Sequence, residues 1–583
     1  MKDDRVRGGG DRIAEALQAS GVETLYTLCG GHVAPILAAA KARGMRIIDV
    51  RDEANAVFAA DAAARISGRP GVAVVTAGPG VSNTITALKN AQLAQSPLLV
   101  IGGAAPTLLQ GRGALQDIDQ GPMLRPQLKH YGKPRRVAEL NPAISEALGR
   151  AQAGIPGPVF VECPVDLLYD EATIRRWYQE ASPRGTSLAA RLQRAYIRWH
   201  LHRQFSGSVR DLQGPAWSVF RPQPKAADID RAARALRASQ RPLLLIGSQA
   251  LVAASHADQV AAAVERLGVP VYLSGMARGL LGRGSAVQFR HYRRQALRAA
   301  DCVILAGLPC DFRLDYGSPI RKDACLIAAN RSAHDARLNR RPRITAIGDA
   351  GCFLQGLAER LGDWQPDAGW TEQLRAQDQK REQEIAAQAQ TKSQGPGVHP
   401  LALFAEIDRI AAADAVFVAD GGDFVATAAY RLHPRAPLRW LDPGVFGTLG
   451  VGAGFILGAA AELPASERWL IWGDGAAGFS LIEIDSFVRH GIGLIAVVGN
   501  DASWTQIARE QVKMLGDDVG TVLARSDYHR VASALGGVGL MIQSPQEMPA
   551  VLAEAQAIAR SGRPVLVNVW LSASDFREGS LSM

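Results

Sequence analysis

Two acidic residues follow apolar, strand-like runs in the last third of the chain. The stretch Gly473-Asp474-Gly475-Ala476 closes one such run, and Asn500-Asp501 closes the next. A glycine turn between a strand and a helix lets backbone N–H groups approach a phosphate, and the helix amino terminus favours its negative charge. An acidic side chain there can hold a divalent cation that bridges to a diphosphate. The 27 positions from Asp474 to Asp501 fit one crossover helix, which predicts that both oxygen ligands lie at the same end of a sheet.

Alternating strands and helices are predicted along most of the chain, and they must position these residues. The predicted strands cover residues 72–76 and 96–101, then 241–247, 270–273, 301–307 and 325–328, then 415–420, 469–473, 494–499 and 564–569. Between the first two, a Gly78-Pro79-Gly80 turn is expected to begin one helix that runs through Leu93. Such alternation is typical of parallel sheets with crossover helices. We therefore predict an α/β fold with three doubly wound, parallel-sheet domains.

Changes in composition set the predicted domain boundaries. The three domains are placed at residues 1–170, 223–365 and 399–583, with linkers at 171–222 and 366–398. The second linker is rich in Gln, Glu and Lys and ends in Gly-Pro-Gly, which predicts a solvated helix followed by a turn. A length of 583 residues agrees with three or four domains.

The first linker carries most of the positive charge. Residues 171–222 contain nine arginines and three acids, a local charge of +6 within a total of +9. The remainder is nearly neutral, which argues against a nucleic-acid surface. Within 187–205, helical projection places Leu188, Leu192, Ala195, Tyr196 and Trp199 in one arc beside Arg191, Arg194 and Arg198. We favour an interdomain or intersubunit strap in which Trp199 packs on a neighbour, over a helix lying on an anionic membrane.

The cysteine pattern and the distribution of apolar residues indicate the cellular compartment. The six cysteines are scattered without a Cys-x-x-Cys pair, which argues against a zinc site and a disulfide framework. The charged amino terminus lacks the apolar core of a signal peptide, and no run approaches ~18 apolar residues. We therefore expect a cytoplasmic protein without a membrane span.

In its strand context, the Gly-Asp-Gly triplet with an oxygen side chain 27 positions later resembles the thiamin diphosphate motif. The resemblance implies that Mg²⁺ is bound by Asp474, Asp501 and the main-chain carbonyl of Ser503. The family usually has Asn where this chain has Asp501, and an aspartate still supplies oxygen. The matching cofactor-binding positions are Gly421, Gly422, Asp423, Leu449, Gly473, Asp474, Gly475, Ala476, Asp501 and Ser503. Leu449 corresponds to the large apolar residue that holds the cofactor in a V shape.

The run Arg51-Asp52-Glu53 before a helix resembles the pyrimidine-domain motif of the same family. There a carboxylic acid bonds to a ring nitrogen of the cofactor and supports proton transfer, so Glu53 is the implied catalytic acid. The resemblance covers the whole chain as pyrimidine-binding, central and diphosphate-binding domains, in the order of the acetolactate synthase group. In that group the glutamate and the metal come from different subunits, which implies a homodimer at minimum and usually a homotetramer.

Five motifs resemble the acetolactate synthase-like, or 2-hydroxyacyl-CoA lyase, branch. They lie at residues 27–33, 115–120, 310–317, 439–444 and 500–506. Members of that branch cleave a 2-hydroxyacyl-CoA to an aldehyde and formyl-CoA, reversibly. His32 matches an active-site histidine of a relative and is the implied proton relay for the substrate hydroxyl, and Gln116 matches the family's active-site glutamine. The alternative is a carboligase of the acetolactate synthase type that decarboxylates pyruvate or another 2-oxo acid.

The central domain of the family binds FAD, ADP or nothing. Arg278, Asp311 and Arg313 lie near predicted strand ends, where a nucleotide or CoA phosphate would bind. The segment that meets FAD in acetolactate synthases is Ala-Asn-Arg-Ser at 329–332 and lacks an acid, which argues against FAD.

Two questions stay open in the sequence. A membrane-associated or regulatory scaffold with vestigial cofactor binding draws on the arginine-rich helix, whereas Glu53, Asp474 and Asp501 favour catalysis. The carboxyl-terminal residues 575–583 can fold over the active site or fray.

Overall fold

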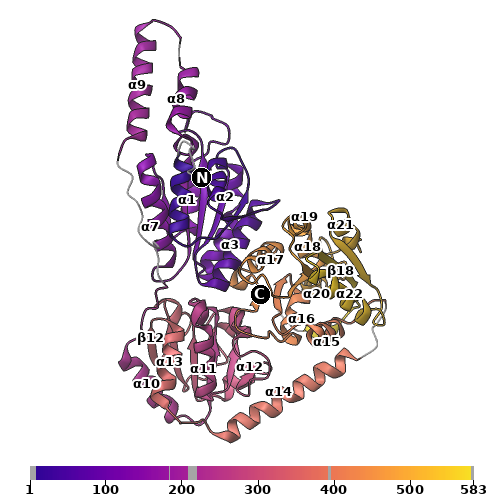
Figure 1. Ribbon diagram of the computed structural model, residues 1–583. Coiled ribbons are helices and arrows are strands. Elements are labelled where there is room, and N and C mark those ends of the chain that lie inside the picture. The colour runs from indigo at the N-terminus through magenta and orange to yellow at the C-terminus, as the bar shows by residue number, and fades with distance from the viewer. Residues whose placement is uncertain (1–7, 183, 208–218, 391–395, 579–583) are drawn as a thin grey trace. The chain divides into compact units, whose positions relative to one another are not determined.

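A computed structural model describes residues 8–182, 184–207, 219–390 and 396–578. The described part contains three parallel sheets of six strands each (Figure 1). The chain separates into two compact units, one of Met1–Ala64 and Arg69–Val219 and the other of Arg65–Gly68 and Phe220–Met583. The first sheet lies in the first unit and the other two lie in the second. The predicted α/β class with three doubly wound sheets is confirmed.

The first sheet has the strand order β2-β1-β3-β4-β6-β5. Its strands are β1 (Thr24–Leu28), β2 (Arg46–Asp49), β3 (Gly71–Val75), β4 (Leu98–Ala104), β5 (His130–Gly132) and β6 (Pro158–Pro164). Helices α1 (Gly9–Ala19), α2 (Ala34–Ala42) and α7 (Leu140–Gln152) bury apolar side chains against alternate strand residues such as Val72 and Val74. Further helices are α3 (Glu53–Ser67), α4 (Pro79–Ser82), α5 (Ile85–Ala94) and α6 (Gln120–Leu124).

The single helix expected after Gly80 is wrong, because α4 and α5 are separate. They are interrupted at Asn83 and Thr84. Asn83 turns its side-chain amide to Glu53, and the Thr84 hydroxyl donates to the Val81 carbonyl at 2.7 Å. Side chains that bond locally in this way compete with a continuous helix.

The central sheet has the order β12-β11-β10-β7-β8-β9. Its strands are β7 (Pro242–Ile246), β8 (Val271–Leu273), β9 (Gln288–Phe289), β10 (Cys302–Ala306), β11 (Cys325–Asn330) and β12 (Ile344–Ile347). Helices α10 (Ala226–Arg237), α11 (Ala257–Leu267) and α13 (Ala350–Leu361) pack in one core with Leu244 and Ile304. Their neighbours Leu243 and Val303 point to the opposite face, where α12 (Arg293–Ala299) packs, so both faces are buried as a doubly wound sheet requires.

The third sheet, β14-β13-β15-β16-β18-β17, repeats the topology of the first. Its strands are β13 (Val416–Asp420), β14 (Trp440–Leu441), β15 (Arg468–Gly473), β16 (Leu494–Asn500), β17 (Val538–Ile542) and β18 (Pro564–Trp570). Its helices are α15 (Pro400–Ile410), α16 (Asp423–Arg431), α17 (Val451–Glu462), α18 (Asp474–Ser480), α19 (Ile484–Arg489), α20 (Thr505–Leu515), α21 (Tyr528–Ala534) and α22 (Met548–Arg560). One core joins α15, α16 and α22 to alternate residues of the strands, among them Phe417 and Ile495.

The two predicted linkers differ from expectation. The first contains two helices, α8 (Glu171–Glu180) and α9 (Leu188–Phe205), capped by Asp170 and Ser187. The second contains α14 (Ala368–Ala389), which is not simply solvated. Trp370 and Leu374 of α14 are buried in the core beneath the central sheet, and the Trp370 indole donates to the Pro242 carbonyl at 2.9 Å. In the described part of the chain, no helix is long and apolar enough to cross a bilayer.

Candidate active site

The carboxyl edge of the third sheet brings two glycine turns together. In an open parallel sheet a ligand binds where the strand order reverses, which is between β13 and β15 here. Gly421 follows β13 with φ of 145°, and a Cβ on it would lie 3.1 Å from the backbone nitrogen of Gly473 after β15. This close approach requires glycine and leaves backbone groups of both turns facing the crevice.

Asp474 and Asp501 lie side by side at this edge. Asp474 accepts hydrogen bonds from the backbone of Gly475 and of Ala502, both at 2.8 Å. Asp501 accepts from the Ser503 backbone at 3.2 Å and the Thr505 hydroxyl at 2.6 Å. Ala502, which follows Asp501 directly, has a φ of 58°, a left-handed conformation that costs an alanine about 1 kcal/mol or more.

Burial, together with the nearby Asp501 carboxylate, raises the pKa of Asp474 to about 7. The pKa of Asp501 is also raised, chiefly by burial. Within the described ranges no lysine or arginine forms an ion pair with either carboxylate. Two buried carboxylates without a cationic partner are costly unless a cation joins them.

The donor set at this edge fits Mg²⁺ with a diphosphate. The Ser503 carbonyl accepts no hydrogen bond from the described part of the chain, and it lies in the same loop as Asp501. In the described residues no cluster of three or more His, Cys, Asp or Glu side chains is present. One or two carboxylates, a carbonyl and phosphate oxygens are the usual ligands of Mg²⁺, so the predicted residues suit this metal better than an all-protein cage.

Asp420 organises the loop that carries Leu449. Its fully buried carboxylate accepts from the backbone of Gly450 at 3.1 Å and of Gly452 at 2.8 Å, and from the Trp472 indole at 3.1 Å. Burial raises the Asp420 pKa to about 6. The half-buried Leu449 therefore sits on a loop fixed to the ends of β13 and β15. Asp420 was not among the residues selected from the sequence, although an aspartate that closes an apolar strand is a signal by which it could have been found.

The other predicted cofactor residues surround the same crevice. A Cβ on Gly422 would lie 2.5 Å from the Gln506 side chain, and one on Gly475 would lie 2.5 Å from the Trp504 ring. Ala476 is buried in the first turn of α18. The Asp423 carboxylate forms an ion pair with Arg509. The backbone of Asp423, and not its side-chain charge, is therefore the group that a ligand could contact.

Tyr528 lies at the same edge and could not be selected from the sequence. Its hydroxyl donates to the backbone carbonyl of Asp474 at 3.3 Å. It follows no glycine turn, and only folding brings α21 next to Asp474.

In the first unit, Glu53 begins α3 and is 6% exposed. Asn83 donates to one Glu53 carboxylate oxygen at 2.9 Å, and the other oxygen lies 3.2 Å from where a Cβ on Gly80 would be. Asn83 was missed because nothing in its local sequence marks it. The Gly78–Gly80 turn thus presents its backbone beside the Glu53 carboxylate.

His32 and Gln116 lie around the same turn. His32 Nδ1 is 3.4 Å from the Thr76 hydroxyl, and burial lowers the pKa of His32, which favours the neutral imidazole at neutral pH. Gln116 has φ of 61°, and its carbonyl lies 2.7 Å from where a Cβ on Gly78 would be. Glu53, His32 and Gln116 therefore form one set in the first unit, and Asp474, Asp501 and Ser503 form another in the second.

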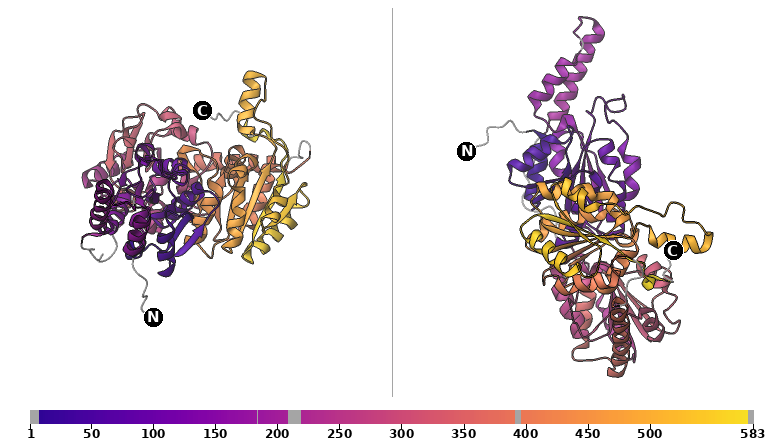
Figure 2. Two further views of the ribbon diagram at one scale, coloured as in Figure 1. Left: turned by 90° about the horizontal axis from the view of Figure 1, so that it is seen from above. Right: turned by 90° about the vertical axis from the view of Figure 1, so that its right-hand side faces the viewer.

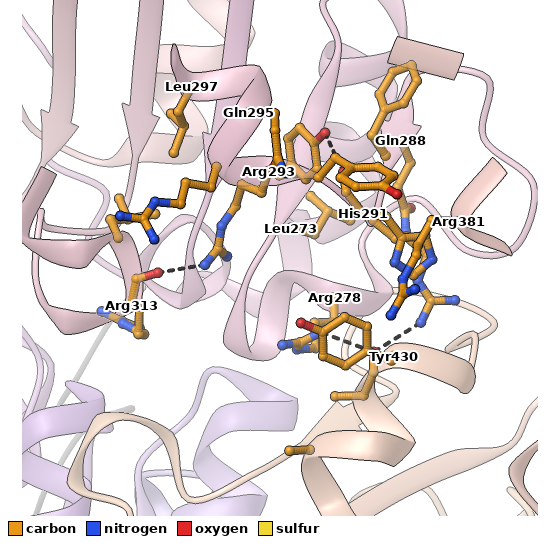
Figure 3. Close-up of a pocket in the computed structure, with 18 of the residues that line it drawn as sticks. Leu273, Arg278, Gln288, His291, Arg293, Gln295, Leu297, Arg313, Arg381 and Tyr430 are labelled. Atoms are coloured by element: carbon orange, nitrogen blue, oxygen red, sulfur yellow. Dashed lines mark hydrogen bonds between the residues drawn. The ribbon is translucent and has the colours of Figure 1, made fainter. Parts of the chain in front are cut away.

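A cavity of about 590 Å³ lies in the second unit, between the central sheet, α14 and α16 (Figure 3). Seven of its lining residues are arginines and one is an acid, Asp315. The arginines are Arg278, Arg290, Arg293, Arg294, Arg313, Arg381 and Arg577. Figure 3 shows Arg278 beside Tyr430 and Arg381 beside His291.

Three of these arginines, Arg278, Arg290 and Arg293, are held by backbone carbonyls, which do not cancel their charge. The other four form ion pairs with acidic side chains. Arg290 donates to the carbonyls of Ala429 and Leu432 at 3.1 and 2.7 Å, and Arg293 donates to the Arg313 carbonyl at 2.6 Å. Burial lowers the pKa of Arg290 to about 10, and the charge of Arg278 lowers the pKa of both Arg290 and Arg293. This repulsion marks a surplus of positive charge, which suits an anionic ligand.

Of the three residues predicted to bind a nucleotide, two line the cavity and one does not. Arg278 and Arg313 line the cavity. The Asp311 carboxylate, in contrast, is engaged by the Arg313 guanidinium at 2.6 Å.

The start of the carboxyl-terminal tail packs beside this cavity. Asp575–Arg577 form a short helical turn, η11. The Phe576 ring meets Tyr430 edge-on at 5.5 Å, and Arg577 lies 3.6 Å from the Asp423 carboxylate. The described part of the tail is therefore docked, and the last five positions of the predicted flap, 579–583, fall outside the described residues.

Three family models match the chain in order. Residues 7–123 match the N-terminal TPP binding domain of the thiamine pyrophosphate enzymes, 229–357 the central domain and 420–569 the C-terminal TPP binding domain. Thiamine pyrophosphate is the same compound as thiamin diphosphate. The central model spans all six strands of the central sheet, the N-terminal model spans β1 to β4, and the C-terminal model spans β14 to β17 and nearly all of β18.

Curated relatives match over nearly the full length. The 2-hydroxyacyl-CoA lyase 2 proteins of Homo sapiens and Bos taurus are 46% and 45% identical, over 99% of this chain and 92% of each relative. The probable acetolactate synthase of Mycobacterium bovis is 34% identical over 96% of this chain and 95% of its own length.

Proposed function

Because the chain belongs to the thiamine pyrophosphate enzymes, we propose that it is a carbon–carbon lyase that cleaves a 2-hydroxyacyl-CoA to an aldehyde and formyl-CoA, reversibly. The observation that carries the substrate class is the 45–46% identity to 2-hydroxyacyl-CoA lyases along 99% of the chain. The lower identity of 34% to an acetolactate synthase supports the same choice.

We propose that the second unit holds the cofactor's diphosphate through Mg²⁺ bound to Asp474, Asp501 and the Ser503 carbonyl. The buried, uncompensated carboxylates support this assignment. The backbones of Gly421 and Gly473 line the crevice, and Leu449 would contact the bound cofactor. When bound, thiamin diphosphate supplies a nucleophilic carbon that makes and breaks bonds next to a carbonyl.

The first unit supplies the proton chemistry of this proposal. Glu53 holds a proton at a ring nitrogen of the cofactor, and its 6% exposure keeps bulk water from competing for that bond. His32, neutral because burial lowers its pKa, accepts the proton of the substrate hydroxyl as the carbon–carbon bond breaks. Gln116 orients the substrate carbonyl as a neutral donor. Accepting that proton would leave His32 as an imidazolium, while Gln116 would stay neutral.

We further propose that the arginine-rich cavity binds the phosphates of the CoA ester. CoA carries a diphosphate and a ribose phosphate, and arginine binds phosphate through paired N–H groups. Arg278, Arg293 and Arg313 are the residues proposed to make these contacts, and Tyr430 offers a ring beside them. An ADP molecule in the central domain would use the same chemistry. The absence of an acid at 329–332 argues against FAD.

A substrate panel tests this function. Purified protein with thiamin diphosphate and Mg²⁺ is incubated with a 2-hydroxyacyl-CoA or with pyruvate, and the products are identified by mass spectrometry. The proposal predicts aldehyde and formyl-CoA, with little acetolactate. Acetolactate from pyruvate, with the CoA ester intact, would instead assign the chain to the carboligases.

Arginine variants test the CoA cavity. Arg278→Ala and Arg293→Ala should each raise KM for the CoA ester by about tenfold or more, because a charged hydrogen bond is worth about 1.5–3 kcal/mol, with a smaller effect on kcat. Arg294→Ala is the matched control, since Arg294 is more than half exposed and pairs with Asp315. Equal KM values in all three variants would place the CoA elsewhere.

We also propose a homodimer at minimum, with a homotetramer as the working form, in a reducing, cytosolic compartment. The loop and helix after the metal residues expose large apolar side chains, which is typical of a subunit interface. They are Met514, Leu515, Val519 and Val522, each 65–73% exposed. All six cysteines are free, which agrees with a reducing compartment.

A further inference from the structure

The outer face of α9 is an apolar stripe that the first unit leaves uncovered. The stripe consists of Leu188, Leu192, Ala195, Tyr196 and Trp199. Leu188 is 73% exposed, Leu192 62% and Trp199 54%. The predicted interdomain or intersubunit strap, in which Trp199 packs on a neighbouring domain or subunit, stays a prediction. Helices α8 and α9 extend together beyond the sheet of the first unit (Figures 1 and 2).

The inner face of α9 fixes this orientation. Ala190, Leu201 and Gln204 are buried, and the Gln204 amide donates to the Asp166 carbonyl at 3.0 Å. His200 is 2.8 Å from the Thr107 hydroxyl. At 100° per residue, Ala190, Leu201 and Gln204 lie opposite the stripe. Because this face of α9 is anchored, the stripe faces outward.

Positive charge borders the stripe. Arg191 and Arg198 project along one side of it, and among the described residues neither forms an ion pair. The Arg203 guanidinium lies 5.8 Å from the centre of the Trp199 ring near its end. Helix α9 contains no acidic residue. An exposed tryptophan–tyrosine–leucine stripe edged by arginine is complementary to a surface that is anionic at its rim and apolar beneath.

We propose that the outer face of α9 binds the surface of an anionic phospholipid bilayer, with α9 lying in the headgroup region. The apolar stripe enters the upper acyl region, and Arg191, Arg198 and Arg203 meet lipid phosphates. The site lies on different elements from the proposed catalytic residues, so the inference is independent of the reaction.

Charge favours a bilayer over a second copy of the same face. Symmetric pairing of two α9 helices brings each side of the stripe against its equivalent. Because α9 carries no acid, arginines of one copy would lie near arginines of the other without compensation. Like charges facing each other in this way oppose association. A lipid surface supplies the negative charge that a second copy lacks.

Vesicle co-sedimentation of the full chain tests this proposal. Wild-type protein is mixed with phosphatidylcholine vesicles, with or without phosphatidylglycerol, and the bound fraction is measured at low and high salt. Binding should require phosphatidylglycerol and weaken as salt rises, because the Debye length shrinks. Arg191→Glu with Arg198→Glu should lower the partition coefficient at least about 25-fold, since each arginine near the surface is worth about fivefold.

Two further variants complete the test. Leu192→Ser with Trp199→Ser should also reduce binding, and Arg266→Glu with Arg298→Glu should not, because these exposed arginines lie on α11 and α12. Activity without vesicles and circular dichroism confirm that each variant is folded. The proposal is overturned if wild-type protein ignores anionic vesicles or if all variants bind equally. It is also overturned if the serine pair instead lowers the oligomer mass measured by light scattering, which would make the stripe a subunit interface.

Discussion

Two buried aspartates at strand ends are stabilised in different ways. Asp420 receives three hydrogen bonds, which fasten the loop before α17. Asp474 receives two and faces Asp501, so its charge needs an external partner. Asp420 therefore fastens a loop of the protein, and these contacts support the proposal that Asp474 binds a cation.

The first prediction concerns Mg²⁺ affinity and pH. The pKa of Asp474 in the folded, metal-free protein is about 7, above its ordinary value, so the group keeps its proton below that pH. Mg²⁺ must displace the proton, and the apparent affinity should fall about tenfold per unit as pH drops below about 7 and level off above it. Isothermal titration calorimetry with thiamin diphosphate present measures this. A flat profile from about pH 5 to 8 would contradict the assignment.

The second prediction concerns Glu53. Glu53→Gln removes the acid while Asn83 can still bond to the amide oxygen, so the fold should persist. We expect kcat to fall by about 10²–10⁴-fold, the usual worth of a proton-transfer group, with a much smaller change in cofactor affinity. Asp52→Asn, one position earlier, is the control and should keep nearly full activity. Equal losses in both variants would assign Glu53 a structural role.

At the scale of elements, ten of the strands and the presence of a helix in the second linker could be predicted, but the packing of that helix, α14, could not. Buried runs such as 494–499 are apolar and β-branched whichever neighbour they pair with, so sequence locates them. Helix α14 has a polar composition that predicts a solvated helix. Its packing rests on a few apolar residues, Trp370 and Leu374, which are too few to change that pattern. The same limit applies to Asn83, Asp420 and Tyr528, whose roles depend on contacts with distant segments.

The third prediction tests the role of α14. Trp370→Ala removes a side chain that is 3% exposed and its bond to Pro242, and it should destabilise the central sheet by about 3–5 kcal/mol. Hydrogen exchange of β7 amides measures this locally, which avoids assuming two-state unfolding. The exposed Glu372→Ala should change it by less than about 0.5 kcal/mol. Unchanged protection of β7 in Trp370→Ala would return α14 to the role of a linker.

At the scale of the whole molecule, the two sets of site residues belong to different units. Glu53, His32 and Gln116 lie in the first, and Asp474 and Asp501 lie in the second. From sequence, spacing predicted that Asp474 and Asp501 share one sheet edge, whereas Glu53, His32 and Gln116 were implied by the family resemblance. The arginine-rich cavity was predicted only at Arg278 and Arg313, because its other residues come from segments that no local pattern links, among them α14 and the tail.

The fourth prediction tests sharing of the site between subunits. Glu53→Gln and Asp474→Asn are each expected to be inactive. If one subunit supplies Glu53 and its partner supplies the metal, mixed dimers contain one intact site of two. Random re-pairing then restores about a quarter of wild-type activity, since half the dimers are mixed. A site formed within one chain would give no recovery, and each variant re-paired with itself is the control.

The fate of the thioester carbon tests the central claim most directly. A 2-hydroxyacyl-CoA labelled with carbon-13 at that carbon is incubated with the enzyme, thiamin diphosphate and Mg²⁺, and all one-carbon products are analysed by mass spectrometry. The account predicts the label in formyl-CoA, or in formate after hydrolysis, with an unlabelled aldehyde in equal amount and neither product in Glu53→Gln. An intact labelled ester, together with carbon dioxide and acetolactate from a parallel incubation with pyruvate, would contradict it.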